Sequence, residues 1–320
     1  MKIIFFGSDN FALPSLRLLS EKREDIDILS VITKPDRRKG RGLKVVPLEI
    51  KVLALKLNLS VYQPEKIDNK VISYIKSLSP GLIVVVAYGR ILPKQILEIP
   101  PRGCVNLHSS LLPDLRGAGA IAYSIIRGYT HTGITTMYMS ETMDAGDIIS
   151  QKKVEIKPED TAGTLSEKLA KEGAELLYCT LKNLKKGDVF STPQDESRAT
   201  YAPMLKKEDG LIDWNKNTEE IFNLIRGLNP WPSAYTYLKG KMLKIHKSVI
   251  DKTPSQKGKP GEIIEVAKNK LIAATSKGNL SILEVQLENR RKMMIEEFLQ
   301  GHRLEKGETL RSSKTKDNKG

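Results

Sequence analysis

The sequence has few of the residues that mark several common classes of protein. It contains two cysteines, Cys104 and Cys179, which lie far apart and outside any CxxC motif. A disulfide framework and a cysteine-based zinc site are therefore not expected, and the chain is expected in the reducing cytoplasm. The longest apolar runs, such as 82–87, have the length of a strand, so no membrane-spanning helix is predicted. The amino terminus also lacks the apolar core of a secretory signal.

A glycine-rich dinucleotide-binding loop is also missing. The first apolar segment, 2–6, is followed by Gly7-Ser8-Asp9-Asn10, which lacks the further glycines of a GxGxxG motif. Those glycines let the backbone approach a pyrophosphate closely, and the carboxylate of Asp9 would repel phosphate. The segment is better interpreted as a tight turn between a strand and a helix. A hydride-transfer enzyme thereby loses its strongest support.

Acidic residues are too few to balance the basic ones. Lysine and arginine number 52 against 38 aspartates and glutamates, which gives a net charge of +14. Between Pro203 and Gly320 there are 23 basic and 15 acidic residues, an excess of eight on this part of the chain. Such an excess attracts polyanions, including nucleic acids. A merely soluble, lysine-rich surface would explain the charge equally well.

The first part of the chain alternates strand-like and helix-like patterns. Strands are predicted at 2–6, 26–33, 82–87, 104–108 and 133–139, and helices at 13–19, 47–57, 71–77, 120–127 and 164–185. This alternation predicts an α/β domain over 1–189, in which a doubly wound, mostly parallel, Rossmann-like sheet carries helices on both faces. The β-branched run at 82–87 fits a central strand that is buried on both faces.

The pattern changes after residue 189. Residues 190–208 are polar, with two prolines and little periodicity, and are predicted to be a linker. Short strands are predicted at 234–238, 242–249, 262–266, 270–274 and 279–285, with glycines at the turns between them. Strands at this spacing predict a second domain, 209–310, built as a small OB-like β-barrel. The lysine-rich residues 311–320 are expected to be disordered.

Two polar residues near the end of the predicted strand 104–108 carry the clearest chemistry. Asn106 and His108 are two positions apart, so their side chains share a face of the strand. They lie at its carboxyl end, where open α/β sheets bind ligands. The same pattern would arise if both side chains were buried polar groups that only form hydrogen bonds within the core and take no part in catalysis. The loop 141–147 follows the next predicted strand, so Asp144 is expected to reach the same edge, orient the imidazole and favour its charged form.

An amide, an imidazole and a carboxylate suit a reaction in which negative charge develops on a carbonyl oxygen. The set lacks a nucleophile, because Ser109 and Ser110 lie beside His108 in the sequence and not across from it. A covalent acyl-enzyme is therefore less expected than the direct transfer of a small acyl group.

Three motifs follow one another in the first domain: 106–113 (Asn-Leu-His-Ser-Ser-Leu-Leu-Pro), Arg116-Gly117, and 143–147 (Met-Asp-Ala-Gly-Asp). Together they resemble the formyltransferase family that uses 10-formyltetrahydrofolate. Further matches at 6–12, 35–42, 85–89, 229–232 and 301–304 resemble the branch of this family that acts on methionyl-tRNA, and the likeness extends to about Leu304. The chain departs from the family at 116–120, where it reads Arg-Gly-Ala-Gly-Ala in place of the usual Arg-Gly-Ala-Ala-Pro.

The resemblance implies roles for these residues. Asn106 and protonated His108 would hold the oxyanion that forms when the α-amine of methionyl-tRNA attacks the formyl carbon of the folate, and Asp144 would support the histidine. It implies no metal and a folate pocket lined by backbone and apolar groups, and the chain is expected to act as a monomer. The residues that match the pocket are Val86, Ala87, Tyr88, Gly89, Ile91, Leu92, Ser110, Leu111, Leu112, Pro113, Ala145 and Gly146.

A basic segment, 34–44, holds six positive charges among eleven residues. A charge run of this kind is ordinarily a solvated loop, but the glycines on either side of Arg41 would let the backbone approach a nucleic acid. In the branch that the chain resembles, this loop reads the acceptor end of the initiator tRNA. The resemblance therefore implies tRNA contacts for Arg37, Arg38, Lys39, Arg41 and Lys44.

Three functions of different classes stay open. The first is formyl transfer to methionyl initiator tRNA, for translation initiation. The second is formyl transfer to a small amine, such as a nucleotide sugar, by the same three residues; the basic loop and the basic second domain count against it. The third is a non-catalytic RNA-binding protein, and the presence of Asn106, His108 and Asp144 counts against that one.

Overall fold

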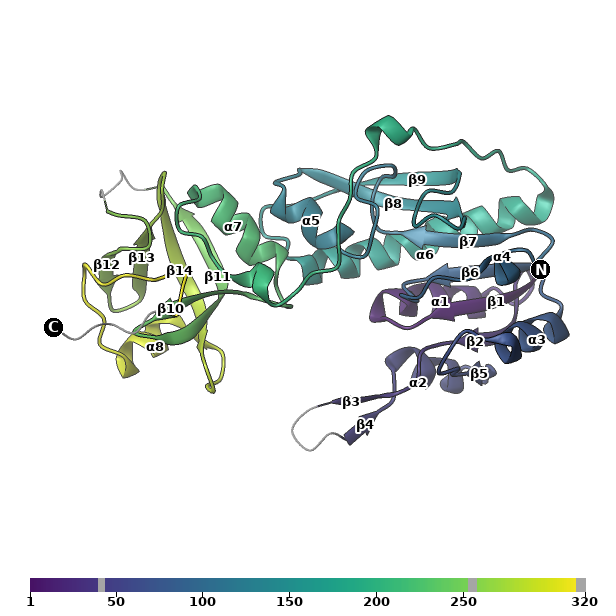
Figure 1. Ribbon diagram of the computed structural model, residues 1–320, viewed down its shortest axis with the longest axis horizontal. Coiled ribbons are helices and arrows are strands. Elements are labelled where there is room, and N and C mark those ends of the chain that lie inside the picture. Colours follow the sequence, from purple (N-terminus) through teal and green to yellow (C-terminus); the bar gives the residue numbers. More distant parts are fainter. Residues whose placement is uncertain (40–43, 253–257, 315–320) are drawn as a thin grey trace. The chain divides into compact units, whose positions relative to one another are not determined.

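The computed structural model describes residues 1–39, 44–252 and 258–314 (Figure 1). The chain folds into two compact units. Unit 1 comprises Met1–Ala120, His131–Glu155 and Ser166–Pro203, and unit 2 comprises Ile121–Thr130, Ile156–Leu165 and Met204–Gly320. The expected linker at 190–208 is thus divided at Pro203, and two short segments that precede residue 166 belong to unit 2.

Unit 1 is built on a seven-stranded sheet in the order β5-β2-β1-β6-β7-β8-β9. The strands are β1 (Lys2–Gly7), β2 (Asp27–Ile32), β5 (Val61–Tyr62), β6 (Leu82–Val86), β7 (Cys104–His108), β8 (His131–Tyr138) and β9 (Ile148–Glu155). The first five strands of that order pair in parallel, while β8 is antiparallel to both β7 and β9. The prediction of a mostly parallel sheet is confirmed.

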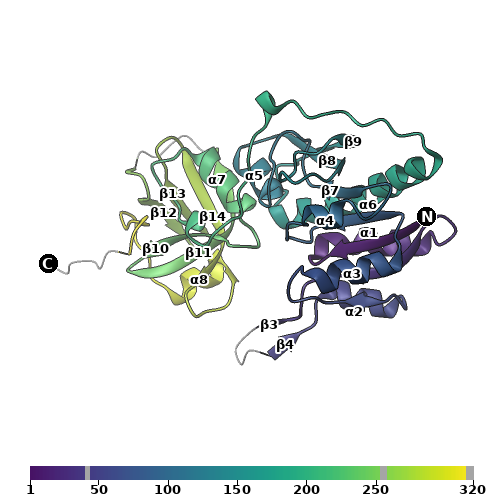
Figure 2. The same ribbon diagram turned by 45° about the vertical axis from the view of Figure 1, so that its right-hand side comes forward.

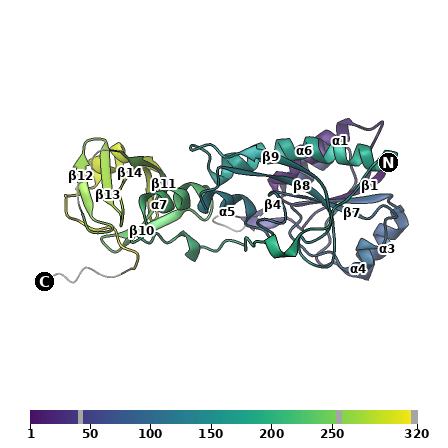
Figure 3. The same cartoon turned by 90° about the horizontal axis from the view of Figure 1, so that it is seen from above.

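Helices cover both faces of this sheet. They are α1 (Leu13–Glu21), α2 (Glu49–Lys56), α3 (Asn69–Leu78), α4 (Lys94–Leu97) and α6 (Ala162–Lys186), with a 3-10 turn η1 (Asn10–Ala12) before α1. Figure 3 shows α1 and α6 on one face and α3 and α4 on the other. Every residue of β6 is buried, because this apolar strand lies between two layers of helices.

The sequence pattern did not predict β9, which lies at the edge of the sheet. Its middle reads Ser-Gln-Lys-Lys, and those lysines are exposed. An edge strand with one solvated side needs few apolar residues, so it carries no strong period-2 signal. The same holds for the two-residue strand β5 at the other edge.

The basic segment forms the base of a β-hairpin. Strands β3 (Arg37–Lys39) and β4 (Lys44–Val46) pair in antiparallel fashion. Arg41 lies outside the described residues, as do the side chains of Arg37, Arg38, Lys39 and Lys44. The base of the hairpin is closed by a hydrogen bond that Leu48 N donates to Asp36 Oδ1 (3.3 Å).

Unit 2 is built on an antiparallel sheet in the order β10-β11-β14-β13-β12, with β15 beside β14. The strands are β10 (Ala234–Leu238), β11 (Lys241–Asp251), β12 (Ile263–Ala267), β13 (Lys270–Ala274), β14 (Asn279–Leu287) and β15 (Met293–Met294). Its helices are α5 (Ala120–Ile126), α7 (Thr218–Gly227) and α8 (Ile295–Gly301), with 3-10 turn η3 (Glu208–Gly210). Helix α7 packs against β11 and α8 against β14 (Figure 2).

The segment 307–311 hydrogen-bonds to both edge strands of this sheet. On the β12 side, Ile263 N donates to Glu308 O (2.7 Å) and Gly307 N donates to Ile263 O (2.8 Å). On the β10 side, Tyr237 and Arg311 exchange two backbone hydrogen bonds of 2.9 Å. The predicted β-strand domain is thus an antiparallel sheet, and no direct pairing of β10 with β12 is found among its described residues.

The expected disordered tail begins inside unit 2. Besides the bonds of Arg311 to Tyr237, Ser312 Oγ donates to Ile212 O (2.7 Å). Residues 315–320 lie outside the described part of the chain. The chain therefore stays hydrogen-bonded to unit 2 at least as far as Ser312. No helix among residues 1–39, 44–252 and 258–314 is long and apolar enough to cross a bilayer.

Candidate active site

The strand order of unit 1 reverses between β1 and β6. The chain goes from β1 to β2 and β5 on one side, and then returns to β6 and β7 on the other. In open α/β sheets, ligands bind outside the carboxyl ends of the strands at such a switch point. Here Gly7 ends β1, the segment 87–92 follows β6, and Ser8 N donates to Ala87 O (3.3 Å). The topology thus places a ligand beside residues that were predicted to line the folate pocket.

The segment after β6 has an unusual backbone. Ala87 (φ 46°) and Gly89 (φ 65°) both lie in the left-handed region, which few non-glycine residues adopt. Lys34 Nζ donates to Gly89 O (2.8 Å), and a Cβ at position 89 would collide with that ammonium group. The positive φ favours glycine at 89, and a Cβ there would also displace the Lys34 ammonium group, so the predicted pocket is shaped by backbone as much as by side chains.

Tyr88 lies between these two residues and is almost fully buried. Its ring packs edge-to-face on Phe6, with the centroids 5.1 Å apart. Burial raises the pKa of the Tyr88 phenol, and the neighbouring Arg90 acts in the opposite direction. The other predicted pocket residues range from buried to exposed: Val86, Leu92, Ser110, Leu112 and Gly146 are buried, Ala87, Leu111, Pro113 and Ala145 are partly buried, and Gly89 and Ile91 are exposed.

Strand β7 carries Asn106 and His108, as the sequence predicts. Asn106 is partly buried, and within the described part of the chain its amide makes no hydrogen bond. It therefore offers two N–H donors and a carbonyl oxygen to a ligand. Cys104, on the same strand, is buried, and this burial raises the pKa of its thiol to about 12. Cys104 is thus protonated at neutral pH and is not a nucleophile.

His108 lies between two acceptors and is 7% exposed. Its Nε2 lies 3.0 Å from Leu115 O, and its Nδ1 lies 3.6 Å from Asp144 Oδ2. A backbone carbonyl only accepts, so Nε2 carries a proton. When Nδ1 is protonated as well, the ring presents a donor to each neighbour, and the positive charge lies beside Asn106.

Asp144 reaches His108 by a different route from the one predicted. Because β8 is antiparallel to β7, the loop after β8 begins beside the amino end of β7, where Met139 N donates to Cys104 O (2.8 Å). The loop then runs back along β7 and brings Asp144 to the other end. Asp144 therefore meets His108 as expected, although the loop reaches it by running back along β7 and not because β7 and β8 end at one edge.

The Asp144 turn is held against the Arg116-Gly117 loop. Gly117 N donates to Asp144 Oδ2 (2.8 Å), the same oxygen that faces His108. Asp144 has a φ of 52°, in the left-handed region. The carboxylate is thus oriented by a backbone amide on one side and faces the imidazole on the other.

A partly buried hydrogen-bond set supports the loop after β7. Gln151, on β9, donates from Nε2 to Leu112 O (2.9 Å) and to Thr135 Oγ1 (2.9 Å). Leu112 N donates in turn to Thr135 Oγ1 (3.2 Å). The sequence did not single out Gln151, because the strand that carries it was not predicted. The loop that follows His108 is therefore fixed from β8 and β9.

The base of the basic hairpin is tied to the sheet by Asp36. Its carboxylate accepts from Lys51 Nζ (2.6 Å), from Gln63 Nε2 (2.9 Å) and from Leu48 N (3.3 Å). The hydrogen bond from Lys51, followed by that from Gln63, lowers the pKa of the Asp36 carboxyl. One ionised carboxylate thus joins the two ends of the hairpin to α2 and to the segment after β5.

Two family models and many relatives match the chain. Residues 1–181 match the model described as formyl transferase, and residues 204–303 match formyl transferase, C-terminal domain. The methionyl-tRNA formyltransferase of Geobacter metallireducens (strain ATCC 53774 / DSM 7210 / GS-15) is 46% identical over 308 residues, which cover 96% of this chain and 97% of that protein. That of Thermodesulfovibrio yellowstonii (strain ATCC 51303 / DSM 11347 / YP87) is 48% identical over 95% of this chain and 97% of the relative.

The chain belongs to the methionyl-tRNA formyltransferase family. Solved structures of other formyltransferases share its fold at lower identity. WlaRD, a sugar 3N-formyl transferase, has a TM-score of 0.66 at 19% identity, over 91% of this chain and 99% of that one. HypX from Aquifex aeolicus, in complex with tetrahydrofolic acid, has a TM-score of 0.63 at 20% identity, over 97% of this chain and 50% of that one.

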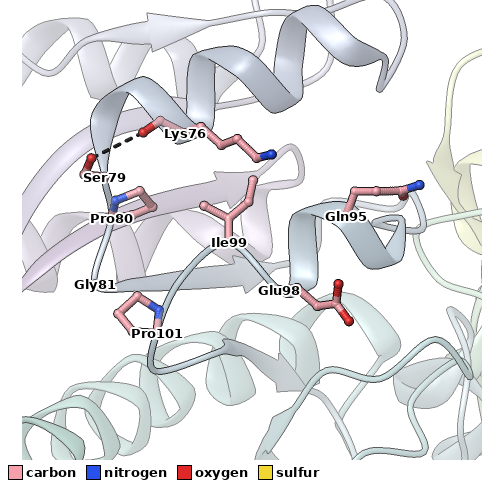
Figure 4. A pocket seen from close by; sticks show the side chains of 8 residues that line it. All are labelled: Lys76, Ser79, Pro80, Gly81, Gln95, Glu98, Ile99 and Pro101. Atoms are coloured by element: carbon pink, nitrogen blue, oxygen red, sulfur yellow. Dashed lines mark hydrogen bonds between the residues drawn. The ribbon is translucent and has the colours of Figure 1, made fainter.

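A hollow on unit 1 lies away from these residues (Figure 4). Its volume is about 690 Å³, and its lining includes Gly81, just before β6, and Pro101, before β7. Because Gly81 and Pro101 precede their strands, the hollow lies at the amino ends of β6 and β7. Asn106 and His108 lie toward the opposite, carboxyl end of β7. No group of three or more metal-ligating side chains is found among the described residues.

Proposed function

We propose that this chain transfers the formyl group of 10-formyltetrahydrofolate to the free α-amino group of methionyl initiator tRNA. The proposal rests on its membership in the methionyl-tRNA formyltransferase family. One geometric observation carries the site assignment: the pair His108–Asp144 lies beside Asn106 at the carboxyl end of β7. The product would serve translation initiation in the cytoplasm.

The reaction needs no covalent enzyme intermediate. The amine nitrogen attacks the formyl carbon, a carbon–nitrogen bond forms, and the carbonyl oxygen becomes negative. Collapse breaks the bond between the formyl carbon and the folate nitrogen. The amine loses a proton, the folate nitrogen gains one, and tetrahydrofolate leaves. The residues of the site must therefore stabilise an oxyanion and help a proton to move.

Each of the three residues has a task in this scheme. The Asn106 amide donates to the oxyanion, and a donor of this kind contributes on the order of 10²–10³ in rate. His108, with its two nitrogens facing Leu115 O and Asp144, acts through its positive charge. Asp144 balances that charge and is the nearest group to relay, through water, a proton toward the folate nitrogen.

The folate would bind at the switch point between β1 and β6. The left-handed backbone at Ala87 and Gly89 supports a ligand at this place. The Aquifex aeolicus HypX structure is a complex with tetrahydrofolic acid, in a protein of the same fold. The pocket residues would be those predicted from the sequence, in 86–92, 110–113 and 145–146, and the transfer would use no metal.

Unit 2 would hold the tRNA as a basic, OB-like barrel. The segment 307–311 supports that architecture, because it hydrogen-bonds to both β10 and the β12 side of the sheet. The excess of 23 basic over 15 acidic residues between Pro203 and Gly320 supports a polyanionic partner. On this proposal the catalytic domain spans 1–189 and the tRNA-binding domain 209–310, in a monomer.

Arg41→Ala is expected to weaken tRNA binding without a change in the KM for the folate. If Arg41 contacts one phosphate, the slope of log Kd against log salt concentration falls by about one unit. The measurement is a salt titration of binding to methionyl initiator tRNA, with Lys153→Ala on the edge strand β9 as the matched control. An equal rise of both KM values would contradict the role in tRNA recognition.

Asp36→Ala is expected to raise the KM for tRNA several-fold and to leave kcat unchanged, because the hairpin loses its anchor. The pKa of this carboxyl is lowered in the folded chain, so the anchor is present at neutral pH and is lost only as the pH falls through that lowered value. Initial rates between pH 6 and 8 should therefore show no pH dependence from Asp36. An unchanged KM for tRNA would show that the hairpin does not need this anchor.

The acceptor is tested by competition. The chain is given 10-formyltetrahydrofolate with either methionyl initiator tRNA or a dTDP-linked amino sugar, since sugar N-formyltransferases share the fold. The expected outcome is formyl transfer to the methionyl group and none to the sugar. Transfer to the sugar alone would overturn the proposal.

A further inference from the structure

A strap of chain crosses the loops that carry the proposed site. It runs from Thr192 to Ala202 within unit 1. Thr192 and Ile148 exchange two backbone hydrogen bonds of 2.8 Å at one end. At the other end Arg116 N donates to Thr200 O and Ala202 N donates to Arg116 O, both at 2.8 Å. No sequence pattern predicted these contacts, because the segment is polar and has no period.

Gln194 is the residue of this strap that reaches the Asp144 turn. Its Nε2 donates to Asp144 O (2.8 Å) and to Gly146 O (2.7 Å). Its Oε1 accepts from Arg116 Nε (3.1 Å) and Nη2 (2.8 Å). Both N–H groups and the carbonyl oxygen of the amide are therefore used. One side chain joins the turn that holds Asp144 to the loop that holds Arg116.

Arg116 holds the oxygen end of Gln194 in place. It is 2% exposed, and it makes a bidentate pair with Glu196, from Nη1 (2.8 Å) and from Nη2 (2.7 Å). A bidentate pair fixes the plane of the guanidinium group, and with it the direction from which Gln194 is held. The next residue, Gly117, donates its N–H to Asp144 Oδ2 (2.8 Å). The same loop therefore orients both the Asp144 carboxylate and the side chain that ties down its backbone.

The Asp144 turn needs such support. Asp144 is a non-glycine residue at φ 52°, a conformation that persists only where the surroundings enforce it. Asp144 Oδ2 lies 3.6 Å from His108 Nδ1, and a change of this backbone conformation would move the carboxylate away from the imidazole. The two bonds from Gln194 Nε2 fall on the carbonyl groups of Asp144 and Gly146, which bracket the turn.

We propose that Gln194 is a positioning residue for formyl transfer, which holds the Asp144 carboxylate toward His108 through the backbone of the Asp144–Gly146 turn. The inference rests on the proposed function of Asn106, His108 and Asp144. Gln194 itself touches neither substrate nor reacting atoms in this scheme. It also gives the strap a function beyond the connection of the two units.

Two substitutions separate the two ends of the amide. Gln194→Glu keeps oxygen acceptors for Arg116 but removes the N–H groups that hold the turn. Gln194→Met removes both and keeps the length of the side chain. Asp195→Asn is the matched control, because Asp195 caps only its own segment by accepting from Ser197 N (3.0 Å). For each variant, kcat, both KM values and the thermal unfolding midpoint are measured with 10-formyltetrahydrofolate and methionyl initiator tRNA.

The proposal expects Gln194→Glu to lose kcat by about 10- to 100-fold, as a small displacement of a site group does, with both KM values near those of the wild type and a smaller fall of the unfolding midpoint than Gln194→Met. Asp195→Asn should match the wild type. A Gln194→Glu variant with native kcat would overturn the proposal. So would a Gln194→Glu variant that loses as much thermal stability as Gln194→Met, because the loss would then be structural.

A double-mutant cycle with Asp144→Asn measures how far kcat falls further when Gln194→Glu is added, and this distinguishes positioning of Asp144 from general destabilisation. If Gln194 acts through Asp144, adding Gln194→Glu to Asp144→Asn should lower kcat by no more than about twofold further. If the two losses multiply, Gln194 acts elsewhere and the proposal fails. An inactive wild-type chain would instead remove the proposed function, so the two failures are distinguishable.

Discussion

His108→Ala is expected to lower kcat for formyl transfer by about 10²–10³-fold, the loss that follows removal of one group that stabilises an oxyanion. The imidazole is buried between Leu115 O and Asp144, and in the proposed mechanism its removal takes away the group that faces the oxyanion with a positive charge. The folate and the tRNA contact other residues in this account, so both KM values should change little. Initial rates at saturating substrate give the result.

The matched control is His131→Ala, at the exposed start of β8. It should retain native kcat. Thermal unfolding of both variants shows whether each remains folded at the assay temperature. A folded His108→Ala protein with kcat within about threefold of the wild type would remove His108 from the mechanism, since the scheme requires a loss of at least 10²-fold.

Gly146→Ala is expected to lower both the stability of unit 1 and the rate of transfer. A Cβ at this position would overlap the carbonyl group of Tyr138, which is backbone and cannot rotate away. Tyr138 N also donates to Asp147 O (2.9 Å), so the two segments cannot separate freely. Overpacking of this kind costs about 1–3 kcal/mol in free energy of unfolding. The displaced turn would carry Asp144 with it, and kcat should fall about 100-fold.

Gly301→Ala is the control for this substitution. Gly301 lies at the end of α8, and a Cβ there would meet no atom within 4 Å. Its unfolding midpoint in urea should equal or exceed that of the wild type, because alanine favours a helix over glycine. If Gly146→Ala unfolded at the wild-type urea concentration and kept its kcat, the turn would be more tolerant than its contacts indicate.

Much of the fold could be predicted from the sequence because apolar periods mark the elements that are buried. The run Leu82–Val86 is apolar throughout, and in the strands of unit 2 apolar residues alternate with polar ones or form short runs. The structure has strands at these places. The edge strands β5 and β9 were missed, because an edge strand exposes one side and needs few apolar residues. The antiparallel direction of β8 was missed as well, since a strand's own sequence does not encode its direction.

The residues of the candidate site likewise include some that a local sequence pattern predicts and some that only the fold brings together. The period of two along β7 predicted that Asn106 and His108 share a face. That Asp144 meets His108 depends on the loop after β8 running back along β7, which no local pattern encodes. Gln194 lies 50 residues beyond the turn that it holds. Such long-range polar contacts have no period, and only the folded chain reveals them.

Single-turnover transfer of an isotopically labelled formyl group tests both the acceptor and the role of Asn106. The unmodified chain, in excess, is mixed with labelled 10-formyltetrahydrofolate and methionyl initiator tRNA, and the aminoacyl group is then released from the tRNA and identified. We expect the label to appear on the nitrogen of methionine, and Asn106→Ala to slow its appearance by on the order of 10²-fold or more. Label that stays on the folate, with a folded protein and intact methionyl-tRNA, would contradict the account.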